Sequence, residues 1–256
     1  MSRKYSLWNT ILLNFRVLPF RQAIRLPIYV GPNLDCEGLR RGCIRIDAPE
    51  IRRKMILLGA SRASMFSRRE QWTHLRFGSG AVLVLGDGVQ VHQGVSIVLP
   101  YSGTLVLGAG SLVNQRSFLY ATKNITLGRN CRVGWDVQIM DSDAHFVYRE
   151  KDNSVANFCS PVVFGNNVWI ASRCTVRKGA RLPPYSILSG SSLLTKDFSD
   201  VTTRGNVFAG SPAKLLASGF FRILDGRLEN RLKEACVTTD VSSIPMPSDF
   251  KVFDHL

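Results

Sequence analysis

The sequence predicts an all-β fold in which short parallel strands wind as a three-sided coil. Large apolar residues recur every six positions without a slip: Phe164, Ile170, Val176, Leu182, Leu188 and Leu194. Four residues after each of the first five stands a small residue: Val168, Cys174, Ala180, Ser186 and Ser192. A period of six fits neither an α-helix nor a simple alternating strand. Each hexad is therefore interpreted as one short strand plus a corner, so that 18 residues complete one turn.

The same frame starts again at Leu85, Leu107 and Leu127. The large residue of each hexad is expected to point inward, and successive turns to stack about 4.8 Å apart. The first two intervals, of 22 and 20 residues, each allow one turn with a small corner insertion. The interval from Leu127 to Phe164 is 37 residues, so about one turn's worth of chain leaves the coil as an extended loop over residues 143–161. The spacing resembles the hexapeptide repeat of left-handed parallel β-helices, which are an exception to right-handed crossovers.

Four segments are expected along the chain. Residues 1–26 form an N-terminal amphipathic helical segment, and residues 27–76 form irregular first coils with a basic insertion. Residues 77–214 form the regular β-helix, and residues 215–256 form a C-terminal helix and tail.

The N-terminal segment places five apolar residues on one helical face: Trp8, Ile11, Leu12, Phe15 and Leu18. Its longest uncharged run, Tyr5–Phe15, is too short to span a bilayer. Two interpretations stay open, an interfacial membrane helix and a helix that caps the open end of the coil.

Charge and cysteine content narrow the partners and the compartment. The chain carries a net charge of +14, and residues 1–76 hold 15 Lys and Arg against 5 Asp and Glu. Such a field predicts an anionic partner at that end. No RNA-binding signature or zinc finger accompanies it, so no nucleic acid is expected. The six cysteines form no CxxC pair, which favours reduced thiols in a cytoplasmic protein.

Beyond the repeat, two stretches carry a family resemblance. They are NNVWIASRCTVRKGARLPPYSILSGSSLLTKDF, from residue 166, and VFAGSPAKLL, from residue 207. They resemble the C-terminal half of hexapeptide-repeat O-acetyltransferases, in particular the branch that acetylates sugars in capsule, exopolysaccharide and O-antigen (lipopolysaccharide) synthesis, related to maltose and galactoside acetyltransferases. The resemblance implies transfer of an acetyl group from acetyl-CoA to a sugar hydroxyl of a surface glycan or its precursor, with no metal.

His145 is the candidate general base. A sugar hydroxyl must lose its proton as it attacks the thioester, and histidine has a suitable pKa. The resemblance places a histidine where the extended loop leaves the β-helix, and His145 stands there. Asp141 and Asp143 are both candidates to orient its ring. Asn114, one coil earlier, matches the family's active-site asparagine and implies contact with the acceptor, whereas His74, His92 and His255 lack such a context.

The resemblance also implies an acetyl-CoA site. The oxyanion is expected to meet backbone N–H groups between Trp169 and Ser172, where Ala171 replaces the usual glycine. An acidic residue of some relatives is replaced by Thr122. Residues expected to contact coenzyme A are Trp169, Ala171, Ser172, Gly190, Thr195, Lys196 and Lys214.

The resemblance further implies a homotrimer with sites between neighbouring subunits. A peripheral membrane contact through the basic N-terminus, at the inner face of the cytoplasmic membrane, is a weaker expectation. Three alternatives remain: an N-acyltransferase acting on a nucleotide-linked amino sugar, a non-catalytic β-helix scaffold, and a zinc carbonic anhydrase, which needs three histidine ligands.

Overall fold

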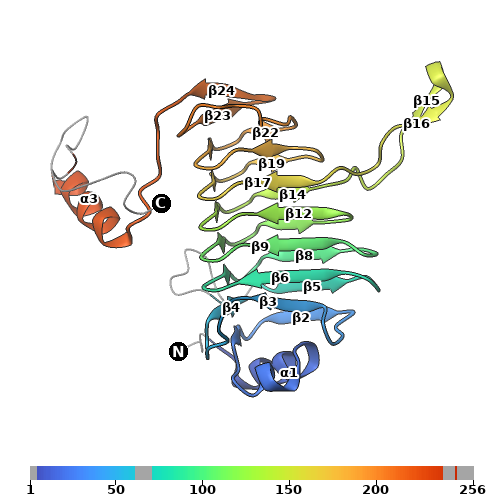
Figure 1. Ribbon diagram of the computed structural model, residues 1–256, viewed down its shortest axis with the longest axis vertical. Coiled ribbons are helices and arrows are strands. Elements are labelled where there is room, and N and C mark those ends of the chain that lie inside the picture. The colour runs from blue at the N-terminus through green and yellow to red at the C-terminus, as the bar shows by residue number, and fades with distance from the viewer. Residues whose placement is uncertain (1–4, 61–70, 239–245, 247–256) are drawn as a thin grey trace. The chain divides into compact units, whose positions relative to one another are not determined.

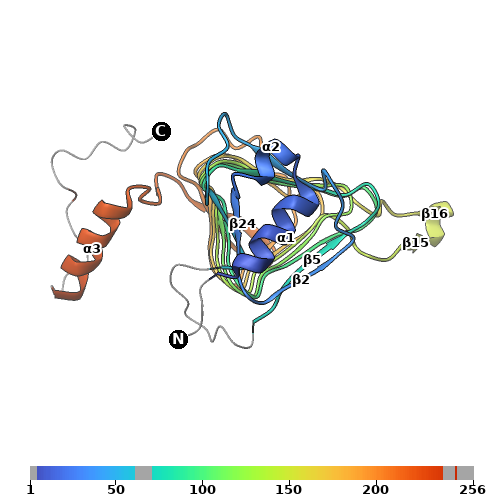
Figure 2. The same ribbon diagram turned by 90° about the horizontal axis from the view of Figure 1, so that it is seen from below.

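Apart from the hairpin of the extended loop and the last two strands, the described strands fall in rotation on three parallel sheets. The computed structural model describes residues 5–60, 71–238 and 246. Successive strands β1, β2 and β3 belong to sheets A, B and C, and the rotation repeats up the coil (Figure 1). Seen along the coil, the three sheets form the sides of a triangle (Figure 2). The three-sided coil predicted from the hexads is confirmed.

Each sheet is a ladder of short strands from successive turns. Sheet A consists of β1 (Ile28–Val30), β4 (Ile56–Leu58), β7 (Gln90–Val91), β10 (Leu112–Val113), β13 (Arg132–Val133), β18 (Trp169–Ile170), β21 (Ile187–Leu188), β23 (Val207–Gly210) and β24 (Ala213–Ala217). Sheet B consists of β2 (Leu34–Glu37), β5 (Thr73–Phe77), β8 (Ser96–Leu99), β11 (Phe118–Tyr120), β14 (Gln138–Met140), β19 (Thr175–Val176) and β22 (Leu193–Leu194). Sheet C consists of β3 (Ile44–Asp47), β6 (Val82–Gly86), β9 (Thr104–Leu107), β12 (Asn124–Leu127), β17 (Val162–Phe164) and β20 (Arg181–Leu182).

The hexad frame sets the register of the sheets. Leu85 pairs with Leu107, Leu107 with Leu127, and Leu127 with Phe164. All six large residues from Phe164 to Leu194 and the five small residues between them are buried. Cys131 and Cys174 are buried free thiols, as the repeat predicts. The interior is therefore a stack of apolar layers that closes around the coil axis.

Residues 27–76 contribute strands to the same three sheets as the later coils. Strands β1 to β4 pair with the strands of the next turn, as Ile44 with Leu83 and Ile28 with Ile56 do. The inward residues of these strands are buried, although β1, β4 and β7 start much farther apart than the 18 residues of a regular turn. The division of the chain at residue 77 stays a prediction. Of the basic insertion, residues 61–70 lie outside the described residues.

Helix α1 (Leu7–Val17), followed by α2 (Phe20–Ala23), covers the first turn of the coil (Figures 1 and 2). Its buried face carries Thr10, Leu13, Asn14 and Val17. The Asn14 side chain donates to the Ile28 carbonyl at 2.7 Å and accepts from the Ile28 N–H at 3.2 Å, and the Thr10 hydroxyl accepts from Val30. Because β1 is an edge strand, these side chains satisfy backbone groups that would otherwise lack partners.

The predicted apolar face of α1 is mostly its outer face. Trp8, Leu12 and Phe15 are exposed, whereas Leu18, just past the helix, is buried. The capping interpretation is confirmed, and the outward apolar residues need a separate explanation.

The extended loop forms an arm that projects from the coil (Figure 1). Strands β15 (Tyr148–Arg149) and β16 (Ser154–Val155) pair antiparallel around a 3-10 turn at Glu150–Asp152.

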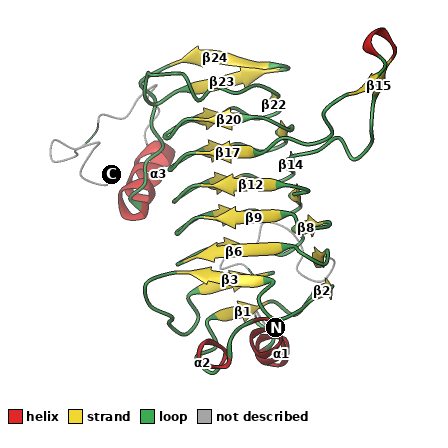
Figure 3. Ribbon diagram, turned by 45° about the vertical axis from the view of Figure 1, so that its right-hand side comes forward, coloured by secondary structure: helices red, strands yellow, loops and turns green. Residues whose placement is uncertain are grey.

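Residues 221–256 are a second unit. It contains α3 (Gly226–Thr238), within the C-terminal helix expected from the sequence, and the Asp225 carboxylate accepts from the Arg227 N–H at 2.7 Å to cap it. Figure 3 shows how few helices accompany the strands. None of the helices in the described ranges combines the length and hydropathy needed to cross a bilayer.

Candidate functional site

The candidate residues lie along two edges of the triangular coil. Edge 1 is the corner where the chain passes from sheet A to sheet B, and edge 2 is the corner where it passes from sheet B to sheet C. Asn114 directly follows β10 and Ala171 follows β18, so both belong to edge 1. His145 follows β14 and Thr195 follows β22, so both belong to edge 2. At about 3.3 Å per residue, one hexad separates the edges by at most roughly 20 Å.

The neck of the arm is held closed by antiparallel backbone contacts. The Ser160 N–H donates to the Asp141 carbonyl at 2.8 Å, and the Asp143 N–H donates to the Phe158 carbonyl at 3.1 Å. Farther out, the Phe146 ring stacks on Phe158 with centroids 4.6 Å apart. The arm therefore leaves the coil as a paired hairpin.

His145 lies at this neck, two residues beyond Asp143. Its preceding residue, Ala144, adopts a left-handed backbone conformation with φ 62°, which turns the chain outward. The His145 side chain is exposed, and its ring makes no hydrogen bond with a described residue. Both ring nitrogens are thus available to an external partner.

Asp141 contacts the backbone of the preceding coil rather than His145. Its carboxylate is fully buried and accepts three backbone N–H groups, from Thr122, Lys123 and Asn124, each at 2.7 Å. This carboxylate therefore connects the edge 2 corner of its own coil to the edge 2 corner of the preceding coil, at residues 122–124. Thr122, which replaces the acidic residue of some relatives, connects the same two corners, since its hydroxyl donates to Ser142 at 3.0 Å.

Asp143 does not contact the His145 ring either. Arg177 donates to its carboxylate at 2.9 Å, and Lys178 pairs with its other oxygen. The hydrogen bond from Lys178, ahead of that from Arg177, lowers the pKa of the Asp143 carboxyl. Both carboxylates therefore have partners at the neck and at the corner, and a role of either in orienting the imidazole stays a prediction.

Asn114 is held in place on edge 1 by the next coil. Its side-chain amide donates to the Val133 carbonyl at 2.9 Å. His92 lies one coil below, close enough for the Asn114 side chain to influence its pKa. The hydrogen bond to Val133 orients the carboxamide before any acceptor arrives.

His92 is a residue that the sequence interpretation set aside. It is buried, and its Nδ1 atom has no hydrogen-bond partner among the described residues. Burial lowers the pKa of His92 to about 4, and the Asn114 side chain offsets this only in part. The available signal was its spacing, because His92 precedes Asn114 by the same 22 residues that separate Leu85 from Leu107.

The Trp169–Ser172 segment offers fewer backbone donors than the resemblance implies. The Trp169 N–H donates to the Ser186 carbonyl and the Ala171 N–H to the Leu188 carbonyl, both on the next coil. The Ser172 N–H makes no hydrogen bond to a described residue. A Cβ atom on Gly134 would come within 2.7 Å of that nitrogen, so only glycine leaves it this much room. Ser172 is thus the remaining backbone donor for an oxyanion.

The other candidate residues for the donor divide between the edges. Gly190 lies on edge 1 one coil beyond Ser172. A Cβ atom on Gly190 would lie 3.3 Å from the Ser172 carbonyl oxygen. Thr195 and Lys196 are exposed on edge 2. Lys214 is exposed on β24, opposite Ala209. In the described part of the chain, no three His, Cys, Asp or Glu side chains gather as they would around a metal ion.

Comparison with proteins of known activity gives a consistent group of relatives. A galactoside O-acetyltransferase of Escherichia coli (strain K12) is 23% identical over 120 residues, covering 47% of this chain and 57% of the relative. A polysialic acid O-acetyltransferase of Neisseria meningitidis is 26% identical over 103 residues, covering 40% and 47%. The chain spans only about half the length of these relatives. No protein-family model matches the chain.

Solved structures agree on the fold. The polysialic-acid-specific acetyltransferase NeuO superposes with a TM-score of 0.54 at 14% identity, covering 82% of this chain and 99% of NeuO. The polysialic acid O-acetyltransferase OatWY gives 0.53 at 22% identity, covering 63% and 78%. These likenesses support the left-handed parallel β-helix that the sequence predicts, and the relatives confirm the resemblance to sugar O-acetyltransferases.

Proposed function

We propose that this chain, whose relatives are galactoside and polysialic acid O-acetyltransferases, transfers an acetyl group from acetyl-CoA to a sugar hydroxyl of a surface glycan or its precursor. The observation that carries the proposal is His145, an exposed histidine without a hydrogen-bond partner among the described residues, at a hairpin neck that backbone hydrogen bonds hold closed at an edge of the β-helix. A free imidazole on a fixed support is what a general base for an alcohol requires.

The proposed reaction uses few groups of the chain. His145 accepts the proton of the sugar hydroxyl as its oxygen attacks the acetyl carbonyl, and the Ser172 N–H donates to the oxyanion. The imidazolium then returns its proton to the departing thiolate. Asn114 holds the acceptor, while Trp169 and Gly190, together with the ammonium groups of Lys196 and Lys214, bind the coenzyme A portion of the donor.

We propose a homotrimer because the groups for this reaction are divided between two edges. Asn114 and Ser172 lie on edge 1, and His145 and Lys196 lie on edge 2, with sheet B between them. They converge only if edge 1 of one copy faces edge 2 of the next, which three copies around an axis along the coil satisfy. The arm then extends over the neighbouring copy.

We also propose a peripheral membrane contact at the cytoplasmic face. It is supported by the excess of Lys and Arg over residues 1–76 and by the exposed apolar side chains on α1. An acceptor assembled on a lipid carrier would then be presented beside the enzyme.

The test replaces His145. His145→Ala should lower turnover by about 10² to 10⁴, the usual contribution of a general base, with coenzyme A affinity retained. His74→Ala is the matched control, because that histidine pairs with Asp35 on an outer strand and should leave the rate unchanged. Coenzyme A release is measured against a panel of free sugars, lipid-linked glycans and nucleotide-linked amino sugars.

Two results would count against the assignment. A near-normal rate in His145→Ala with an intact fold would remove the base. Activity confined to the amino sugars would replace the O-acetyltransferase by the N-acyltransferase alternative, whose fold is also similar: the Bacillus cereus N-acyltransferase AntD superposes with a TM-score of 0.51 at 9% identity.

A further inference from the structure

The end of the coil capped by α1 and α2 carries an exposed apolar surface. Trp8 and Phe15 lie at helical spacing on the outer face of α1, with Leu12 at its border towards β2, and Phe20 and Ile24 continue the surface along α2. The exposed fractions of Trp8 and Phe20 are 69% and 64%. Side chains of this size on one outward face indicate an interaction surface rather than scattered exposure.

Basic side chains surround this surface. Arg16, Arg21 and Arg25 lie on or just after the two helices and are exposed. Lys54 lies 4.4 Å from the centre of the Tyr5 ring, so its ammonium is held beside the same end of the coil. The acidic Asp35 on β2 is already paired with Arg76. Glu37, Asp47 and Glu50 also lie in the first coil, but Lys and Arg outnumber Asp and Glu 15 to 5 over residues 1–76, so the net charge there is positive, as an anionic lipid surface requires.

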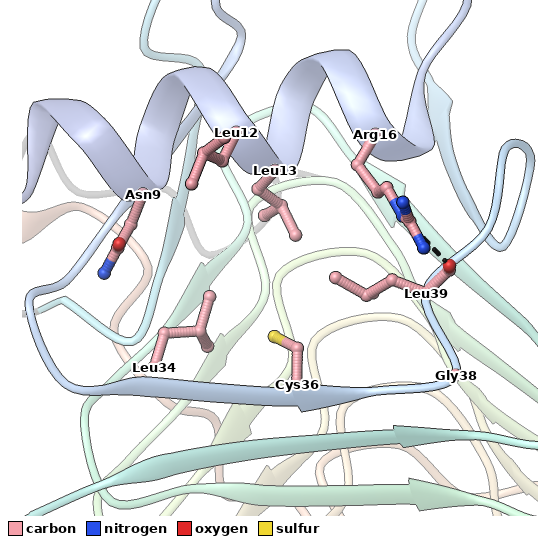
Figure 4. A pocket seen from close by; sticks show the side chains of 8 residues that line it. All are labelled: Asn9, Leu12, Leu13, Arg16, Leu34, Cys36, Gly38 and Leu39. Carbon is pink, nitrogen blue, oxygen red and sulfur yellow. Dashed lines mark hydrogen bonds between the residues drawn. The ribbon is translucent and has the colours of Figure 1, made fainter.

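A cavity of about 410 Å³ opens between α1 and β2 beneath this surface (Figure 4). Figure 4 shows leucine side chains entering it from the helix and from the strand, with Arg16 at one end. Its apolar lining consists of Leu12, Leu13, Leu34, Cys36 and Leu39. The volume is within the range of ligand pockets, and its walls suit a hydrocarbon chain.

Arg16 gives the cavity a polar end. Its Nε donates to the Leu39 carbonyl at 3.3 Å, which fixes the guanidinium. Its two terminal nitrogens make no hydrogen bond or ion pair with a described residue, so they can donate to an anion. A fixed guanidinium beside an apolar slot matches a phosphate with an alkyl tail.

We propose that this cavity receives one acyl chain of an anionic membrane phospholipid, whose phosphate pairs with Arg16 while Trp8, Phe15 and Phe20 enter the lipid interface. This deepens the membrane contact proposed above, on which it rests, and it does not depend on acetyl transfer. Binding is therefore measured without acetyl-CoA, so its failure is distinct from failure of the enzymatic assignment.

The first experiment titrates the full chain with hexyl, octyl and decyl phosphate below their micelle concentrations. Affinity should rise about fourfold per added methylene, the equivalent of about 0.8 kcal/mol, with one site per chain. Inorganic phosphate lacks the alkyl chain and decanol lacks the phosphate group. Each should bind at least tenfold more weakly than decyl phosphate. Cys36→Phe, which fills the cavity, and Arg16→Glu should each weaken decyl phosphate binding at least tenfold.

Arg45→Glu is the matched control for charge, because Arg45 is exposed on β3 at the same end of the sequence but away from the cavity. It should stay within about twofold of the wild type if binding is local rather than a response to net charge. If Cys36→Phe does not fold, Leu39→Phe fills the cavity from its other side. Equal weakening by Arg45→Glu and Arg16→Glu, or unchanged binding in a folded cavity-filled variant, overturns the proposal.

The second experiment identifies the membrane as the source of the lipid. The chain should float with vesicles containing phosphatidylglycerol and not with pure phosphatidylcholine vesicles. The double variant Trp8→Ser/Phe15→Ser should lose at least tenfold in partitioning, whereas Leu216→Ser, an equally exposed apolar site on β24, should not. Failure of the wild type to bind the anionic vesicles, even with decyl phosphate binding intact, overturns membrane docking.

Discussion

The buried histidine on edge 1 makes stability depend on pH. Burial lowers the pKa of His92 to about 4 in the folded chain, against about 6.5 when unfolded. Between these values the unfolded chain binds the extra proton, so stability falls as pH decreases through this window and this contribution is constant below it.

The expected size of this effect is roughly 3 kcal/mol between pH 7 and pH 4. His92→Gln keeps a polar side chain without that titration, so its unfolding free energy should lack this part of the slope. Denaturant unfolding of both proteins across the window measures the difference. Parallel pH profiles would show that His92 titrates normally.

Asp141 offers a second test at the level of one side chain. Asp141→Ala leaves three part-buried N–H groups of residues 122–124 without their acceptor, so we expect a loss of about 2 to 4 kcal/mol in unfolding free energy. Asp136→Ala is the control, because Asp136 forms a partly exposed pair with Arg116 on edge 1. That change should cost about 1 kcal/mol or less. Similar losses in thermal unfolding would contradict the corner role of Asp141.

The element α1 depends on polar side chains that face inward. Asn14→Leu keeps the size of the side chain but removes both hydrogen bonds to Ile28, leaving groups of the edge strand β1 buried without partners. We expect a destabilisation of about 2 to 4 kcal/mol. Leu12→Asn makes the opposite exchange, of an apolar side chain for a polar one, at an exposed position of the same helix. It should lower the unfolding free energy by less than about 1 kcal/mol. Urea unfolding compares the two variants.

The arm is held to the coil by the ion pairs of Asp143. Lys178→Ala removes one of its partners and a contact to the Asn157 carbonyl. Hydrogen exchange at the neck amides of Asp143 and Ser160 should then rise about tenfold, while core strands keep their protection. Because folding lowers the pKa of Asp143, its ionised carboxylate stabilises the neck above about pH 4. This stabilisation is lost as the pH falls through the pKa that Asp143 has in the folded chain. If hydrogen exchange at the neck amides is unchanged in Lys178→Ala, the backbone hydrogen bonds alone hold the neck closed.

At the scale of the whole molecule, the division of candidate residues between two edges can be tested by mixing subunits. His145→Ala and Asn114→Ala chains are each expected to be weakly active. If one site uses His145 of one copy and Asn114 of the next, equal mixtures reassembled together should recover about a quarter of wild-type activity, since random assortment leaves that share of sites intact. Activity no higher than that of the separate variants would contradict an intersubunit site.

Much of the fold could be predicted because the hexad is a local rule. A large residue followed four positions later by a small one determines which side chain points inward, and parallel stacking then follows from repetition, as the register of Leu85, Leu107 and Leu127 demonstrates. The first coils were expected only as irregular ones because their hexads are degenerate, although Ile28 and Ile44 are buried like later members. The position of His145 at the start of the arm could be read from the length of the insertion.

The sequence by itself therefore determined the three-sided coil, the site of the arm and the histidine at its base, since each depends on spacing along one chain. Tertiary structure alone decided the partners of polar groups. It assigned Asp141 to the backbone of residues 122–124 and Asp143 to Arg177 and Lys178, and it buried His92 against Asn114. It also turned the polar face of α1 inward. The physical reason is that these partners lie one or more turns of the coil apart, where residues are neighbours in space only once the turns have stacked.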